Sequence, residues 1–181
     1  MRILAEDTMA LIIDFQERLV PVIKDNEELL QHTAILIKGL RMLGIPMVVT
    51  QQYTKGIGMT VQKISEAVGE DFKYYDKITF SCADDETIME QIEKTGKKNI
   101  IVCGMEAHIC VLQSVIDLIG MEYNVILVDD CVGSRRDKDR LAAVQRAALE
   151  GAAITTYEAI LFELTRKAKT DVFKEISRLI K

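Results

Sequence analysis

The chain has 181 residues, of which 49% are apolar, and this composition excludes an intrinsically disordered chain. Its formal net charge is −5, its pI is about 5.2, and its longest basic segment, SRRDKDR, is interrupted by aspartates. Nucleic-acid binding is therefore not expected, because proteins that bind nucleic acids carry a basic surface that neutralises phosphates.

The N-terminal segment and the cysteines indicate where the protein works. The apolar run in MRILAEDTMALIIDF is short and carries Asp7 and Asp14, which argues against a signal peptide and against a membrane span. The chain has four cysteines and no C-x-x-C pair, so we expect reduced thiols and a cytoplasmic protein. Its length fits a single domain over residues 1–181.

Short apolar runs alternate with segments of helical periodicity along the chain. In chain order, the patterns predict a strand at 9–14, a helix at 26–44, a strand at 46–51, a loop at 51–64, a less defined strand at 73–80, a helix at 84–96, a strand at 99–104, a helix at 107–120, a strand at 123–130, a helix at 137–151, a strand at 152–157 and a C-terminal helix from 172. The four internal helices each end at a glycine suited to a C′ position. The strands are almost continuously apolar, which is typical of strands buried on both faces.

This alternation predicts an α/β protein with a three-layer Rossmann-like fold. A six-stranded parallel sheet would be flanked by helices on both faces. In such a sheet, ligands bind beyond the carboxyl ends of the strands. The polar residues expected at these ends are Asp14, Gln51, Gln52, Glu106, Asp129 and Asp130.

The roles of these carboxylates are ambiguous from the sequence. Asp14 directly follows a buried strand, which is unfavourable unless its side chain is hydrogen-bonded or functional. A helix cap or a loop salt bridge explains Asp14 as well as catalysis does, and the same holds for Asp129 and Asp130. Lys77, in the aromatic and apolar segment YYDKITFS, reads by itself as a surface lysine.

Cys110 lies in the first turn of the helix predicted from Ala107, where the helix dipole would stabilise a thiolate. The alternative is a buried structural cysteine, which is the expected role of Cys103 in its strand. His108 does not share a helix face with Cys110, which argues against a Cys–His dyad. The chain has two histidines, His32 and His108, and they cannot fill the first shell of a zinc ion. We therefore predict no metal and no cofactor.

Five segments together resemble one known family. They are ALIIDFQERL, VVTQQYTKGIG, DKITFSC, VCGMEAHICVLQSVIDL and DDCVGSR, and they follow the order and spacing of the isochorismatase-like cysteine hydrolases from about residue 8 to the end. The resemblance is closest to the isochorismatase domain-containing branch. It implies a catalytic triad of Asp14, Lys77 and Cys110 that hydrolyses a small-molecule amide or carbamoyl compound through a covalent thioester-type intermediate.

The resemblance also implies details of the site. A cis peptide bond would join Met105 to Glu106, and the backbone N–H groups of Glu106 and Cys110 would form an oxyanion hole. Position alone suggests that a substrate pocket includes Gln16, Arg18, Gln52 and Tyr53. The resemblance further implies a homo-oligomer, a dimer or a larger assembly. In it, the QQYTKGIG loop of one copy would help to close the pocket of a neighbouring copy.

Departures from the family leave alternatives open. Nicotinamidases of this family bind a metal through an aspartate–histidine cluster after the second strand, and QQYTKGIG has neither residue type. This difference argues against a metal and against nicotinamidase activity. One alternative is a vinyl-ether hydrolase of the isochorismatase type, with Asp14 as general acid, whose activity would survive Cys110→Ala. The other is a non-catalytic oligomeric member of the fold.

Overall fold

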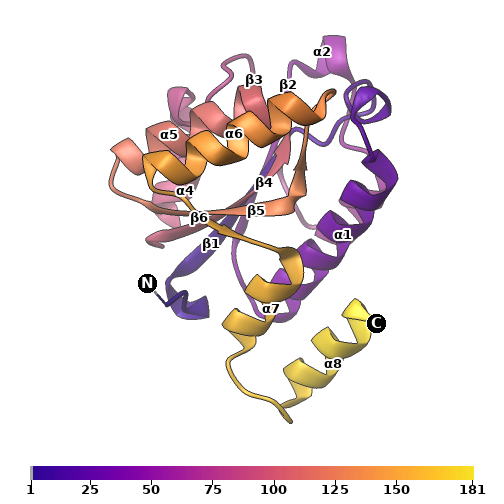
Figure 1. The fold of residues 1–181 in the computed structure, drawn as a ribbon, viewed down its shortest axis with the longest axis vertical. Coiled ribbons are helices and arrows are strands. Elements are labelled where there is room, and N and C mark those ends of the chain that lie inside the picture. Colours follow the sequence, from indigo (N-terminus) through magenta and orange to yellow (C-terminus); the bar gives the residue numbers. More distant parts are fainter. Residues whose placement is uncertain (1) are drawn as a thin grey trace.

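The computed structural model describes residues 2–181 and builds them around one parallel six-stranded sheet (Figure 1). The strands are β1 Thr8–Ile13, β2 Met47–Gln52, β3 Tyr74–Lys77, β4 Asn99–Met105, β5 Asn124–Gly133 and β6 Ala153–Thr155. The α-helices are α1 Asn26–Met42, α2 Thr54–Ile57, α3 Gln62–Val68, α4 Glu86–Lys94, α5 Leu112–Gly120, α6 Asp137–Glu150, α7 Tyr157–Thr165 and α8 Asp171–Ile180. Shorter helical turns are η1 Ala5–Asp7, η2 Val20–Val22, η3 Cys82–Asp84 and η4 Ala107–Val111. The predicted fold class is confirmed.

Helices cover both faces of the sheet and create two apolar cores (Figure 1). Helices α1, α3, α7 and α8 pack on one face, and α4, α5 and α6 pack on the other. The central strands β1 and β4 are buried along their whole length, which explains why their sequences are almost continuously apolar. Among residues 2–181, no helix is both long and apolar enough to cross a membrane.

Three of the predicted strand ends were wrong. Strand β3 ends at Lys77 and not at residue 80, and the ends of β5 and β6 differ for identifiable reasons. Strand β5 continues beyond the predicted end at residue 130 to Gly133, because its two aspartates have partners. The Asp129 carboxylate accepts from Arg140 Nη1 at 2.6 Å, and Asp130 accepts from the Tyr157 backbone N–H at 2.9 Å. Strand β6 ends at Thr155 because helix α7 starts at Tyr157, and the sequence pattern did not reveal this helix.

The secondary structure of two segments with candidate site residues also differs from the predictions. The expected loop at 51–64 contains α2 and the start of α3. The helix expected at 107–120 is divided into a π-turn, η4, and the regular helix α5. Gly120 lies inside α5 instead of following it, and the left-handed position is taken by Glu122, with φ 65°. The other three helix-terminating glycines have the predicted positive φ angles.

The order of the strands places two functional segments side by side. The order is β3-β2-β1-β4-β5-β6, so the direction of strand addition reverses between β1 and β4. Ile13, the last residue of β1, pairs with Gly104 near the end of β4. Asp14 therefore leaves the sheet beside the turn that leads to Cys110, at the switch point where α/β proteins bind ligands.

Gly104 permits the close approach of these two strands. Its φ is +153°, and a Cβ atom on it would lie 2.5 Å from the Ile13 carbonyl oxygen. We expect Gly104→Ala to lower the free energy of unfolding by about 1–3 kcal/mol, because backbone atoms cannot yield to the added methyl group. Urea denaturation measures the change, and Gly120→Ala, which meets nothing within 4 Å, is the control. Equal stability of the two variants would contradict this account of Gly104.

Candidate active site

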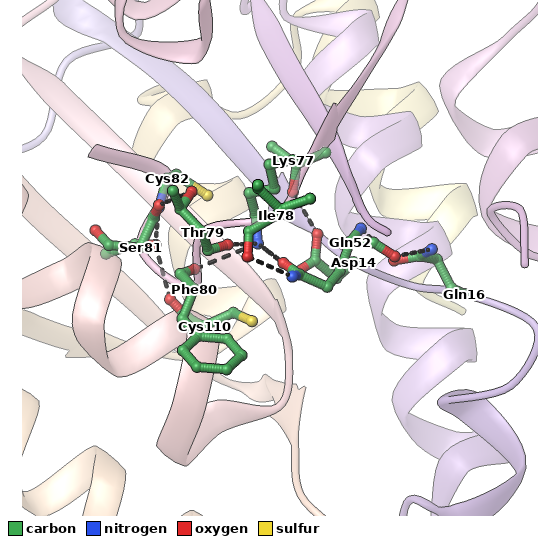
Figure 2. Close-up of polar contacts among 12 residues, drawn as sticks. Asp14, Gln16, Gln52, Lys77, Ile78, Thr79, Phe80, Ser81, Cys82 and Cys110 are labelled. Carbon is green, nitrogen blue, oxygen red and sulfur yellow. Dashed lines mark hydrogen bonds and ion pairs between the residues drawn. The ribbon is translucent and has the colours of Figure 1, made fainter. Parts of the chain in front are cut away.

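Three predicted site residues meet at the carboxyl edge of the sheet (Figure 2). Asp14 follows β1, Lys77 ends β3 and Cys110 lies in η4, directly after β4. Strand β2 lies between β1 and β3, and its last residue, Gln52, pairs in register with Lys77. Side chains from four strand ends thus converge on one position.

Asp14 and Lys77 form a buried ion pair. Lys77 Nζ donates to Asp14 Oδ2 at 2.8 Å, and both side chains are 0% exposed. The other carboxylate oxygen, Oδ1, accepts from the Thr50 hydroxyl at 2.7 Å. Asp14 has φ 55°, a left-handed conformation that aspartate tolerates better than most residues.

Three further oxygen atoms surround the Lys77 ammonium group. They are Gln52 Oε1 at 2.7 Å, the Thr79 carbonyl at 3.2 Å and the Phe80 carbonyl at 3.3 Å. Burial alone lowers the pKa of Lys77, but the Asp14 carboxylate and the neighbouring cysteines outweigh burial, and the pKa is raised. Lys77 is therefore a fixed positive charge in the site.

Cys110 lies beside this ion pair and is 6% exposed. Burial and the Asp14 carboxylate raise the pKa of its thiol from 9.0 to about 12, although Lys77 acts in the opposite direction. Any stabilisation of a thiolate by the helix N-terminus stays a prediction, and burial and the neighbouring carboxylate act against it. The resting thiol is protonated near neutral pH and needs a base to become a nucleophile.

Ser114 connects the Cys110 turn to the segment that follows Lys77. Its hydroxyl donates to the Cys110 carbonyl at 2.7 Å and accepts from the Cys82 backbone N–H at 2.8 Å. Ser114 is fully buried. Ser114 was not among the predicted site residues, although its position one helical turn after Cys110 was a possible signal.

The turn before Cys110 has the predicted backbone. The Met105–Glu106 peptide bond is cis, which confirms that prediction. Within residues 2–181, the Glu106 N–H has no hydrogen-bond acceptor. The Glu106 carboxylate is held by Arg135 Nε, at 2.9 Å from Oε1 and 3.1 Å from Oε2. His108 shares a hydrogen bond with Ser134, with Nδ1 and Oγ 3.0 Å apart, and does not pair with Cys110.

Of the four suggested pocket residues, Arg18 and Tyr53 are exposed, whereas Gln16 and Gln52 are buried. Tyr53 is 52% exposed, and Arg18 is exposed with Nη1 donating to the Gly56 carbonyl at 2.7 Å. Gln16 is fully buried, and its amide nitrogen donates to the carbonyls of Gln52 and Gly58 at 2.9 and 2.7 Å. Tyr53 and Arg18 are accessible to a ligand, whereas the N–H groups of Gln16 are used within the protein.

The loop after β2 is held by hydrogen bonds at the position where a metal site was considered. Gln51 Oε1 accepts from the backbone N–H and the hydroxyl of Thr60, at 2.8 and 2.9 Å. Over the part of the chain described, no three His, Cys, Asp or Glu side chains are grouped so that they could hold a metal ion. The His32 ring stacks on the ring of Tyr157. The absence of a metal stays a prediction.

The raised pKa of Cys110 predicts a pH-dependent reaction with iodoacetamide. Only the thiolate reacts, so we expect the rate of alkylation to rise about tenfold for each pH unit between pH 7 and 10. Peptide mass mapping locates the label, with fully buried Cys103 as the unreactive control. A plateau in the rate below pH 8 would contradict a pKa near 12.

Comparison with known proteins shows the family of the chain. Residues 8–159 match the family model of the isochorismatase domain. The chain is 38% identical over 168 residues to Isochorismatase domain-containing protein 1 from Danio rerio, a match that covers 93% of this chain and 59% of that protein. A similar relative from Salmo salar is covered to 61%, so the chain spans about three fifths of the length of these two relatives.

Two solved structures share the fold over almost the whole chain. The MAR1 ribonuclease from Caenorhabditis elegans has a TM-score of 0.93 and 36% identity, with 99% of this chain and 92% of that chain covered. The YcaC gene product from Escherichia coli, described as an octameric hydrolase of unknown specificity, also has a TM-score of 0.93. Its identity is 22%, with 99% of this chain and 89% of that chain covered, and this likeness shows the fold alone.

Proposed function

Because the chain belongs to the isochorismatase family of hydrolases, we propose that it hydrolyses the C–N bond of a small-molecule amide or carbamoyl compound. Asp14, Lys77 and Cys110 form the catalytic triad. The observation that carries this proposal is the fully buried pair of Lys77 and Asp14, 2.8 Å apart, beside the protonated thiol of Cys110. A buried acid, base and thiol together are what nucleophilic catalysis requires.

In the first half of the reaction, Asp14 takes the proton of the Cys110 thiol and the thiolate attacks the carbonyl carbon. This transfer moves a negative charge from oxygen to sulfur and leaves the net charge of the buried site unchanged. Lys77 stays positive throughout and stabilises whichever group holds the negative charge. The C–N bond then breaks, the leaving amine takes the proton from Asp14, and a thioester remains on Cys110.

In the second half, water attacks the thioester carbonyl while Asp14 accepts a proton from the water. The C–S bond breaks, and the Cys110 thiolate recovers its proton from Asp14. In both halves, the oxyanion that develops on the substrate is bound by the N–H groups of Glu106 and Cys110. Arg135 orients the Glu106 side chain and thereby fixes this turn.

Two large apolar side chains are exposed next to the candidate site. Ile78 and Phe80, directly after Lys77, are 80% and 54% exposed, which is unusual for large apolar side chains beside a catalytic centre. A second copy of the chain that covered them would also close the site, in keeping with the octameric state described for YcaC. We therefore propose a homo-oligomer of at least two copies. The four free thiols favour a cytoplasmic protein.

A substrate screen with the wild-type protein and Cys110→Ala in parallel tests the proposal. Small amides and carbamoyl compounds should be hydrolysed by the wild type alone. Turnover of isochorismate by both proteins would instead identify a vinyl-ether hydrolase with Asp14 as general acid. Inactivity on every compound, with intact folding, would favour the non-catalytic member of the fold.

RNA cleavage is a second candidate, because the C. elegans structure is named a ribonuclease. The net charge of −5 and the absence of a basic run weigh against it, since phosphate binding needs positive charge. A labelled single-stranded RNA belongs in the same screen. Cleavage of RNA by the wild type, and its loss in Cys110→Ala, would replace the amide substrate with RNA.

A further inference from the structure

Gln52 contacts the Lys77 ammonium group and also the segment that follows it (Figure 2). Its amide oxygen accepts from Lys77 Nζ at 2.7 Å, and its amide nitrogen donates to the Ile78 carbonyl at 3.0 Å. The contact with Ile78 fixes the turn that presents the Thr79 and Phe80 carbonyls to the same ammonium group. The Gln52 side chain thus contacts Lys77 directly and also fixes the turn whose two carbonyls make the longer contacts with Lys77.

Gln52 is itself held rigidly. Its backbone N–H donates to Gln16 Oε1 at 2.6 Å, and its carbonyl accepts from Gln16 Nε2 at 2.9 Å. Both glutamines are buried, with exposures of 0% for Gln16 and 8% for Gln52. The position of the Gln52 amide is therefore defined by the protein and does not depend on a ligand.

The charges around Cys110 make the neutrality of this amide important. The ionisable groups that act on the Cys110 thiol are Asp14 from the end of β1, Lys77 from the end of β3 and Cys82 from η3. With Gln52 neutral, Lys77 has one carboxylate partner, and the buried cluster has no net charge. A second carboxylate on Lys77 would leave a net negative charge beside the thiol and oppose its ionisation.

We propose that Gln52 is a positioning residue of the triad, which fills an acceptor position on the Lys77 ammonium group with a neutral amide and so compensates the Lys77 charge only in part, leaving the rest to act on Cys110. This inference rests on the proposed function, because it treats Cys110 as the nucleophile. It also assigns Gln52 a role behind the triad and removes it from the surface that contacts the substrate.

The alkylation rate of Cys110 with iodoacetamide, measured over a pH series, tests this role without a substrate. At a given pH, Gln52→Glu should react about tenfold more slowly than the wild type, because the added carboxylate opposes the thiolate. Gln52→Met should react about threefold faster, because removal of the amide oxygen leaves the Lys77 charge less compensated. Loss of structure alone does not produce two shifts of opposite sign.

Gln51→Glu is the matched control. Gln51 precedes Gln52 and is 4% exposed, but its side chain points to the other face of β2 and contacts Thr60. Its alkylation profile should stay within about twofold of the wild type. Unchanged profiles for both Gln52 variants, shifts of the same sign, or an equal shift in Gln51→Glu would overturn the proposal. Shifted profiles in a protein without amidase activity would support the role of Gln52 and reject the proposed reaction.

Discussion

Replacement of Cys110 by alanine is expected to lower the rate of amide or carbamoyl hydrolysis by at least about a thousandfold. The alanine cannot form the covalent intermediate, and what remains is water attack aided by the oxyanion donors and substrate binding. The measurement is kcat with the best substrate from the screen. Asp14→Asn should lose about a hundredfold to ten-thousandfold through loss of the general base.

Cys103→Ala is the matched control, because the same exchange removes a buried thiol. The Cys103 side chain packs in the core between the sheet and α1, on the other face of the sheet from Cys110. It should keep the activity of the wild type while being less stable. If Cys110→Ala kept more than a tenth of the wild-type rate, a nucleophilic role for this thiol would be wrong.

Replacement of Lys77 by methionine should have the largest effect on stability. The change leaves the Asp14 carboxylate buried without its cation, and loss of one partner of a buried pair costs about 3–5 kcal/mol. Urea denaturation of the purified protein measures this loss. The double variant Asp14→Asn/Lys77→Met removes both charges and should recover at least half of the lost stability without recovering activity.

Lys94→Met is the control for a lysine paired at the surface, since Lys94 and Glu90 have side-chain exposures of 64% and 65%. Surface pairs of this kind contribute little, so its stability should change by less than about 1 kcal/mol. A similar small change in Lys77→Met would mean that the buried ion pair does not stabilise the fold.

The sheet was predictable because burial on both faces leaves a strong pattern in the sequence. The apolar runs that became β1 and β4 ended within one residue of the predicted positions. Strand β5 was harder, because Asp129 and Asp130 look like the start of a loop. Their partners, Arg140 and the backbone N–H of Tyr157, lie in helices that follow β5, and a strand pattern does not encode such contacts.

The site was only partly predictable from its residues. Strand ends correctly selected Asp14 and the turn before Cys110, because topology alone brings them together. Lys77 looked like a surface lysine, since nothing in YYDKITFS indicates a carboxylate 63 residues earlier in the chain. Only the family resemblance identified it as a member of the proposed triad. The raised pKa of the Cys110 thiol could not be read from the sequence, because desolvation depends on packing, whereas the helix dipole can be inferred from sequence.

The roles of the glutamines also required the structure. Gln16 and Gln52 were placed in a possible pocket because they follow strands, and strand position does not reveal the direction of an amide group. The structure shows that they hydrogen-bond to each other and that Gln52 reaches Lys77. Polar residues at a strand end can therefore support a site from behind, and only their contacts distinguish them from residues that face a substrate.

Mass spectrometry of the protein during turnover tests the central claim most directly. With a hydrolysed amide or carbamoyl substrate, rapid acid quenching should trap a protein heavier by the mass of the acyl or carbamoyl group, and peptide mapping should locate that group on Cys110. The adduct should be absent from Cys110→Ala and should disappear when the substrate is exhausted. Steady hydrolysis by the wild-type protein with no adduct on Cys110, or with an adduct on another residue, would contradict the proposed mechanism.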